Sequence, residues 1–370
     1  MEPFRYPFLR PYMPPPDRWT RYLERSYAAG RYTNFGPVND LFERQLELFA
    51  AIPGRRAVTC ASATSGLAAV LMGLGVQGKV VVPSFTFPAT LHSVMMAGCH
   101  PVLCDVDATT WELSPEIVES VLNRHGISAV VHVRAFGFCR DLRPISRLCE
   151  GAGIPLVIDA AAAMGGSISP GVASGGQGTA EVFSLHATKV LGIGEGGVIF
   201  CRPDDAVRFS RALNFGLGAS GFSRALNGKL PEFAAAIGLA VLESAGEVVA
   251  RRAVAARRYL DFFRSMNRIG TPNDPGLPTW QTFPALFPGG IDVAPLLESA
   301  SRRRLELRRY YRPALHRIVP PECAILDAAP VATALADRMV CFPIYPDMRE
   351  EDQAAILAIT REAMAETQCG

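Results

Sequence analysis

Short apolar runs alternate with helical patterns from residue 57 to residue 201. The apolar runs, each of strand length, are 57–60, 79–82, 101–104, 128–133, 155–158, 181–185 and 197–201. The helical patterns between them are 63–74, 88–97, 115–123 and 141–152. This alternation predicts an α/β fold built on a mostly parallel sheet with helices on both faces. Ligands of such sheets bind at the carboxyl ends of the strands, so the loops that follow the strands are where we expect a site.

The flanking segments predict the remaining organisation. Helices are expected at 17–30 and 37–51, and one long helix from about Pro231 to Arg264 would bridge two domains. Short elements then suggest a smaller α+β domain, at 279–287, 292–303, 331–337, 339–342 and 350–366. We therefore expect three parts: an N-terminal arm (1–16), a large domain (17–245) and a small C-terminal domain (246–370).

Composition excludes several classes of function. The 370 residues carry a formal net charge of +2 and only 19% charged residues, which favours neither a nucleic-acid nor a membrane partner. The N-terminus is rich in proline and aromatic residues and lacks the apolar core of a secretory signal. The nine cysteines show no zinc-site spacing, so we expect no metal site and interpret them as buried thiols of a cytoplasmic protein.

Lysine is rare, which draws attention to each one. The chain has three lysines, Lys79, Lys189 and Lys229, so 34 of its 37 basic residues are arginine. Arginine cannot form an imine, because its guanidinium group stays protonated. Lys189 follows a strand in S-L-H-A-T-K and precedes the glycine-rich G-I-G-E-G-G. A lysine desolvated there would be a nucleophile, although a glycine-rich hairpin with an incidental lysine fits the spacing equally well.

Three further motifs each follow a predicted strand. Asp159 ends P-L-V-I-D, where it could bind a cationic ring nitrogen or cap a helix. Ala63 and Thr64 begin a helix, whose N–H groups suit a phosphate, or an ordinary N-cap. Phe87 in F-T-F-P could stack on a planar ring or pack in the core. Together with Lys189, these residues predict a cofactor site.

At this point the sequence resembles the DegT/StrS sugar aminotransferases, a family of pyridoxal-phosphate (PLP) enzymes of fold type I. The resemblance extends over nearly the whole chain, and its motifs are most similar to those of the nucleotide-sugar 4-aminotransferases. It rests on T-N-F-G-P, V-P-S-F-T-F-P-A-T, P-V-L-C-D-V-D, D-A-A, S-L-H-A-T-K, G-E-G-G, L-N-F-G, L-N-G-K-L-P-E-F, L-R-R-Y-Y-R-P-A-L-H and V-C-F-P-I-Y-P.

The resemblance implies a role for each matching residue. Lys189 would hold the cofactor as a Schiff base and shuttle a proton, and Asp159 would pair with the pyridine nitrogen. Phe87 would stack on the ring. The implied phosphate ligands are Ala63, Thr64, Ser184 and, from the partner subunit of a homodimer with shared sites, Asn227.

The implied substrate side departs from the family pattern. The residues expected on the substrate side are Arg134, His186, Tyr310, Tyr311 and His316. Ala162 stands where the family usually has histidine or glutamine, three residues after the aspartate, and Arg134 opens R-A-F-G where the family often has H-V-Y-G.

The activity that the resemblance implies is transfer of an amino group from an amino acid, glutamate being the expected donor, to a keto sugar. A nucleotide-linked sugar of amino-sugar or natural-product biosynthesis is the expected acceptor. Two alternatives stay open: dehydration or elimination on a similar intermediate, and a non-catalytic regulator that keeps the fold. Retention of Lys189 argues against both.

Overall fold

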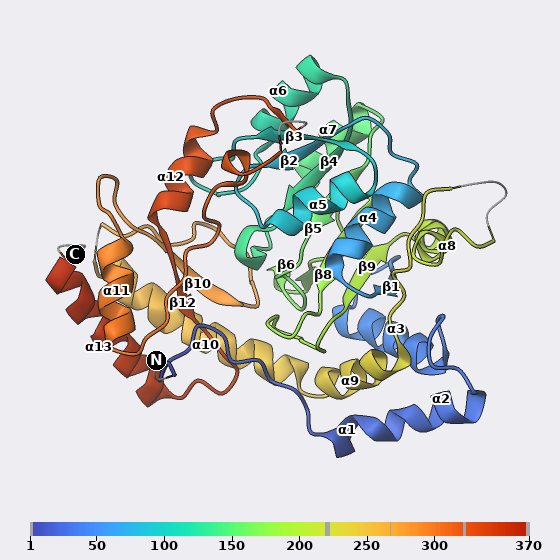
Figure 1. Cartoon of the computed structure of the whole chain (residues 1–370), viewed down its shortest axis with the longest axis horizontal. Coiled ribbons are helices and arrows are strands. Elements are labelled where there is room, and N and C mark those ends of the chain that lie inside the picture. Colours follow the sequence, from blue (N-terminus) through green and yellow to red (C-terminus); the bar gives the residue numbers. More distant parts are fainter. Residues whose placement is uncertain (1–2, 219–222, 267, 321–322, 368–370) are drawn as a thin grey trace.

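An eight-stranded sheet forms the centre of the computed structural model, which describes residues 3–218, 223–266, 268–320 and 323–367 (Figure 1). The strand order is β1-β9-β8-β5-β4-β2-β3-β11. The strands are β1 (Arg56–Cys60), β2 (Lys79–Pro83), β3 (His100–Cys104), β4 (Ile127–Val133), β5 (Leu156–Asp159), β8 (Ala180–Ser184), β9 (Gly197–Cys201) and β11 (Ala324–Ile325). Within this sheet β9 alone runs opposite to the other strands, so the predicted mostly parallel sheet is confirmed.

Helices cover both faces of the sheet. Alternate residues of a strand point to opposite sides, so both faces carry apolar side chains that need to be covered. Val81 packs in one apolar cluster, whereas Val80 and Val82 pack in another on the other face. The helices between the strands are α4 (Ala63–Gly73), α5 (Pro88–Met96), α6 (Pro115–His125), α7 (Arg143–Gly151) and α8 (Pro203–Ala212). A 3-10 turn, η2 (Ala135–Gly137), follows β4. A short hairpin of β6 (Ser167–Ser169) and β7 (Val172–Ala173) was not expected from the sequence.

The helical segments before and after this region differ from the expectation in two places. The expected helix 17–30 is divided into α1 (Pro16–Thr20), η1 (Arg21–Leu23) and α2 (Glu24–Ala29), whereas α3 (Pro37–Ala50) is as predicted. The continuous helix expected over 231–264 is wrong. It is two helices, α9 (Glu232–Leu242) and α10 (Ala245–Arg264), which meet at 62°.

The break between α9 and α10 is explained by the side-chain contacts of Glu243 and Ser244. The Glu243 carboxylate accepts hydrogen bonds from Arg18 (2.6 Å) and from the Tyr22 hydroxyl (2.6 Å), which draws this residue toward α1 and η1. The Ser244 hydroxyl bonds back to the Val241 carbonyl at 3.4 Å, in competition with the helical ladder. Among the described residues no single helix is long and apolar enough to cross a membrane, and α9 with α10 meets that criterion only as a bent pair.

The C-terminal region packs in an apolar cluster that it shares with loops of the large sheet, through residues such as Phe85 and Phe136. The antiparallel strands β10 (Thr282–Leu286) and β12 (Met339–Pro343) pack with α10 through stacked rings that include Tyr259, Phe263 and Phe283. The other elements are α11 (Ala294–Arg302), η3 (Leu315–Arg317), α12 (Pro330–Arg338) and α13 (Glu350–Thr367). The unexpected strand β11 pairs with β3, so this region also contributes to the large sheet. The division into domains at residue 245 stays a prediction.

The N-terminal arm crosses from the C-terminal region to α1, passing along α10 (Figure 1). Its Tyr6 N–H donates to the Arg304 carbonyl (3.1 Å), and the Phe8 N–H donates to the Glu306 carboxylate (2.9 Å). The Phe8 ring is buried. The eight cysteines in the described ranges are buried as expected, while Cys369 lies outside the described residues.

One buried carboxylate, that of Glu232, joins the helices α2, α3 and α9. Glu232, at the start of α9, accepts hydrogen bonds from the Ser26 hydroxyl (2.9 Å) and from the N–H groups of Val38 (2.7 Å) and Asn39 (3.0 Å). It thereby caps α3 and ties it to α2. A Cβ at Gly36 would lie 2.7 Å from the Glu232 carboxyl carbon, so the T-N-F-G-P turn needs its glycine.

We predict that Glu232→Gln lowers the free energy of unfolding by about 1–3 kcal/mol, because the amide would turn a donor toward backbone N–H groups. The shift of the urea unfolding midpoint measures it. Glu247→Gln, which breaks only the exposed pair with Arg251, is the matched control and should change stability by less than about 0.5 kcal/mol. Equal effects of the two substitutions would contradict the assignment.

Candidate active site

One cavity of about 480 Å³ opens at the carboxyl ends of β2, β4, β5 and β8. It brings together most of the residues predicted from the sequence. Those that line it are Ala63, Thr64, Phe87, Arg134, Asp159, Ser184, His186, Lys189, Tyr310 and Tyr311. Asn227 and His316 are outside the set of described residues that line it.

Lys189 lies in the loop between β8 and β9. The loop folds back on itself through hydrogen bonds from the Ala187 N–H to the Gly194 carbonyl (2.7 Å) and from the Lys189 N–H to the His186 carbonyl (2.8 Å). A Cβ at Gly192 would lie 2.6 Å from the Ala187 carbonyl oxygen, so this turn requires glycine. Burial lowers the pKa of the Lys189 amine from 10.5 to about 8, although the charge of Asp159 opposes the shift.

Asp159 is the last residue of β5, the strand next to β8, and is 6% exposed. Its Oδ2 accepts from the Thr90 hydroxyl (2.7 Å) and its Oδ1 from the Ala161 N–H (3.1 Å). Burial raises the pKa of this carboxyl group, while both hydrogen bonds and the Lys189 charge oppose that effect. A cationic N–H from a bound ring would favour the carboxylate further, so the site fits a pyridinium partner.

The start of α4 offers an anion site at the edge of the same cavity. Ser62 caps the helix by accepting from the Ser65 N–H (3.1 Å), which leaves Ala63 and Thr64 in the first turn, where N–H groups have no intrahelical acceptor. A Cβ at Gly197 would lie 2.8 Å from the Ala63 nitrogen, so the G-E-G-G motif permits this approach of β9. Phe87, at the start of α5, is 56% exposed, as a ring available for stacking should be.

Arg134 has a different environment from the one expected. Its side chain is buried, and Nε donates to the Glu181 carboxylate (3.1 Å). The terminal nitrogens donate to the Arg140 carbonyl (2.9 Å) and to Gln177 Oε1 (3.1 Å). The guanidinium group therefore has protein partners at each nitrogen, which supports a structural role for Arg134 and gives no support to its predicted contact with substrate.

The other predicted substrate residues are distributed unevenly. His186 Nδ1 bonds the Thr188 hydroxyl (2.8 Å) at the cavity wall. Tyr311 stacks on Phe136 with ring centroids 5.3 Å apart and lies beside Tyr310, so both tyrosines are held in place by neighbouring rings. His316 instead contacts Thr333 through Nε2 (3.1 Å).

Several cavity residues were missed by sequence reasoning. Thr86 lines the cavity, and its hydroxyl bonds that of Thr90 (2.9 Å), which in turn donates to Asp159. The two threonines are four residues apart in S-F-T-F-P-A-T, a spacing that could have been noticed. Arg308 is one of several arginines in L-R-R-Y-Y-R and is held by Glu306 (2.9 Å) and Tyr310 (3.4 Å). Gln281 is bonded to Lys189 and had no sequence signal.

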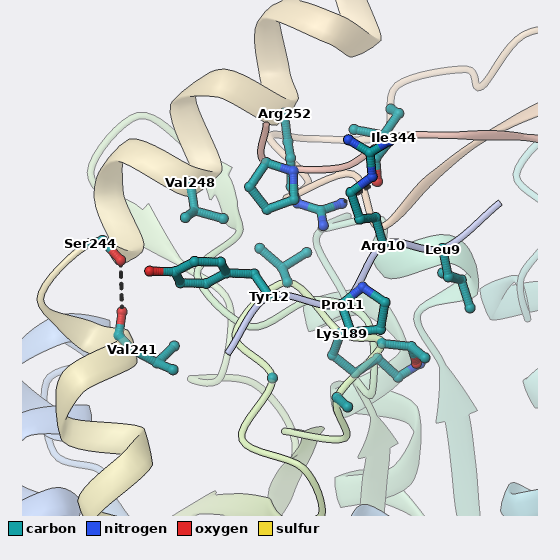
Figure 2. A pocket seen from close by; sticks show the side chains of 15 residues that line it. Leu9, Arg10, Pro11, Tyr12, Lys189, Val241, Ser244, Val248, Arg252 and Ile344 are labelled. Atoms are coloured by element: carbon teal, nitrogen blue, oxygen red, sulfur yellow. Dashed lines mark hydrogen bonds between the residues drawn. The ribbon is translucent and has the colours of Figure 1, made fainter. Parts of the chain in front are cut away.

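The N-terminal arm closes the site behind Lys189. Leu9 lines the main cavity, and Leu9 to Tyr12 also line a small void of about 20 Å³ on the other side of the Lys189 loop. Figure 2 shows Tyr12 beside Val241 and Val248, at the junction of α9 and α10. Residues from the start of the chain therefore form part of the wall around the lysine.

This combination of fold and site defines an enzyme that uses a lysine amine beside a buried acid, at the strand ends of an α/β sheet. The chain belongs to the DegT/DnrJ/EryC1/StrS aminotransferase family, whose model matches residues 17–361. A curated relative, Protein MT3510 of Mycobacterium tuberculosis, is 30% identical over 97% of this chain and 90% of its own length.

Two solved structures are similar over almost the whole chain. DesI, crystallised in the presence of its TDP-sugar product, has 27% identity and a TM-score of 0.89, covering 99% of this chain and 96% of its own. DesV of S. venezuelae, in complex with a ketimine intermediate, has 25% identity and a TM-score of 0.82, covering 94% and 95%. The predicted family and fold are thus confirmed.

We predict that Lys189 reacts with aldehydes at lower pH than an ordinary lysine, because only the neutral amine attacks. With the pKa lowered to about 8, labelling should be half-maximal near pH 8 and level off roughly one pH unit higher. An amine with the ordinary pKa of about 10.4 keeps gaining reactivity over this range. Reductive labelling with borohydride, followed by peptide mass spectrometry, measures each site. The exposed Lys79 in the same sample is the comparison, and identical profiles for the two lysines would contradict the assignment.

Proposed function

We propose that this aminotransferase binds PLP and transfers an amino group from glutamate to the keto group of a nucleotide-linked sugar, in amino-sugar or natural-product biosynthesis. The observation that carries the proposal is that Lys189 and Asp159 line one cavity from adjacent strands. When bound, PLP supplies an electron sink that stabilises charge on the carbon losing its proton. The buried thiols fit a reducing compartment, so we place the enzyme in the cytoplasm.

The chain's own residues have separable tasks. Lys189 is the covalent attachment point, and its free amine, with the pKa lowered to about 8, suits a group that takes and returns a proton near neutral pH. Asp159 would hold the ring N–H. The N–H groups of Ala63 and Thr64 and the Ser184 hydroxyl would bind the phosphate, with Phe87 stacked on the ring.

The substrate side of the cavity supports an anionic donor. Arg308 lines the cavity together with Tyr310, Tyr311 and His186, and a guanidinium group binds a carboxylate in a fixed planar geometry. Glu306 partly compensates its charge at 2.9 Å. Glutamate carries two carboxylates, so we assign one of them to Arg308. Retained Lys189 favours this transfer over elimination and over a non-catalytic role.

The direct test supplies purified protein with PLP, glutamate and a panel of keto sugars, and follows release of 2-oxoglutarate. We expect turnover with at least one nucleotide-linked keto sugar. Lys189→Arg keeps the charge but cannot attach the cofactor, and loss of proton transfer alone should reduce turnover on the order of 10²–10⁴-fold. Turnover by Lys189→Arg at the wild-type rate would remove Lys189 from the mechanism.

We also propose that the enzyme is a homodimer whose sites use both chains. Asn227 is exposed and lies outside the set of described residues that line the cavity of its own chain, and its Oδ1 accepts from Lys229 (2.6 Å). The neighbouring segment, which is bridged to Asn227 at Asn214, presents two large apolar side chains, Phe215 (61% exposed) and Leu217 (64% exposed), which a partner would cover. Asn227 would then reach the phosphate in the partner's cavity.

Subunit mixing tests this arrangement. Lys189→Ala and Asn227→Ala chains, each impaired alone, are allowed to exchange subunits. If sites are shared, one site of the mixed dimer carries both defects and the other carries neither, so about half of the activity of a wild-type dimer should return. Verified mixed dimers that stay inactive, or a protein that is monomeric at working concentration, would rule out shared sites.

A further inference from the structure

A single glutamine contacts both the amine of Lys189 and the loop that carries it. Gln281 Oε1 accepts a hydrogen bond from Lys189 Nζ at 3.1 Å, and Gln281 Nε2 donates to the Thr188 carbonyl at 3.3 Å. The side chain lines the main cavity. Gln281 precedes β10, so it reaches the lysine from the C-terminal region, far away in sequence.

The backbone of Gln281 is itself firmly held. Arg252, from α10, is 4% exposed, and one of its terminal nitrogens donates to the carbonyls of Trp280 (3.1 Å), Gln281 (3.3 Å) and Ile344 (2.8 Å). Figure 2 shows Arg252 reaching from α10 toward the side of the cavity where Lys189 lies. The next residue, Thr282, bonds the Phe342 carbonyl of β12 (2.6 Å). The amide of Gln281 is therefore presented from a rigid support.

We propose that Gln281 is a positioning residue, which holds the Lys189 amine whenever that amine is not attached to the cofactor. The inference rests on the proposed function, because amino transfer requires the lysine to be attached and free in turn. A free lysine side chain adopts many rotamers, and fixing it in one of them costs entropy. A fixed acceptor limits that freedom and returns the amine to the same place for the next attachment.

A neutral amide is suited to this task. Asp159 already provides a negative charge near the amine, and a second carboxylate would favour the protonated form, which cannot attack an aldehyde. Gln281 accepts the hydrogen bond without adding charge. The titratable or charged groups that surround the lysine, lining the main cavity or the void behind its loop, are Asp159, Arg134, His186, Glu195, Arg308, Tyr310, Tyr311, Arg10, Tyr12 and Arg252.

The test measures how fast PLP attaches to Lys189 in the cofactor-free protein as a function of pH, by absorbance and by borohydride trapping. Gln281→Leu removes the acceptor at similar volume, and should slow attachment about tenfold and move the profile to lower pH. Gln281→Glu keeps an acceptor but adds charge, and should move the profile about one unit to higher pH. The opposite directions of the two shifts identify a role at the amine.

Gln353→Leu is the matched control. Gln353 is another buried glutamine of the C-terminal region, bonded to the Ala255 carbonyl of α10 (2.6 Å), and it is not among the cavity-lining residues, so its profile should equal that of the wild type. Wild-type rates in Gln281→Leu, or the same shift in all three variants, would overturn the proposal. A wild-type chain that attaches PLP but releases no 2-oxoglutarate would instead overturn the proposed transfer reaction, and one that never attaches PLP would refute both.

Discussion

Two opposite charges kept away from water are the constraint on which the site depends. Asp159 ends β5 and Lys189 follows the adjacent strand β8, so parallel pairing alone brings a carboxylate and an amine to one edge of the sheet. Burial raises the pKa of the acid and lowers that of the amine, and the value of about 8 for Lys189 suits a group that takes and returns a proton near neutral pH. The tight turns around them require Gly137 and Gly192, because a Cβ at either position would collide with a backbone carbonyl oxygen.

Several of the predicted residues that line the cavity lie at the end of a strand or soon after it. Apolar runs identify strands, and parallel pairing brings their ends together, so Ala63, Phe87 and Asp159 could be grouped from sequence. Gln281 and Leu9 reach the same cavity from the two ends of the chain, through packing of the C-terminal region and the arm. No local pattern predicts such long-range contacts.

Two departures from the expectation have a common physical origin in side chains that bond far from their own segment. The helix expected over 231–264 ends early because Glu243 is bonded to Arg18 and Tyr22, which lie more than two hundred residues away in sequence. Arg134 lines the cavity, yet Glu181 and Gln177 also bind its guanidinium group inside the protein, which the sequence did not predict. Glu232, the glutamate of L-N-G-K-L-P-E-F, has no role that the sequence alone reveals, and the structure shows that its carboxylate caps α3.

The short strand β11 ties the C-terminal region to the edge of the large sheet. That region is joined to the sheet by the junction of α9 with α10 and, separately, by the pairing of Ala324 and Ile325 with β3. Between these two attachments, the Asp105 carboxylate accepts hydrogen bonds from the N–H groups of Val331 (2.9 Å) and Ala332 (2.7 Å). Gln281 and Arg308 therefore belong to a region that is fixed to the sheet at several places, so their positions at the cavity depend on contacts made far from Lys189.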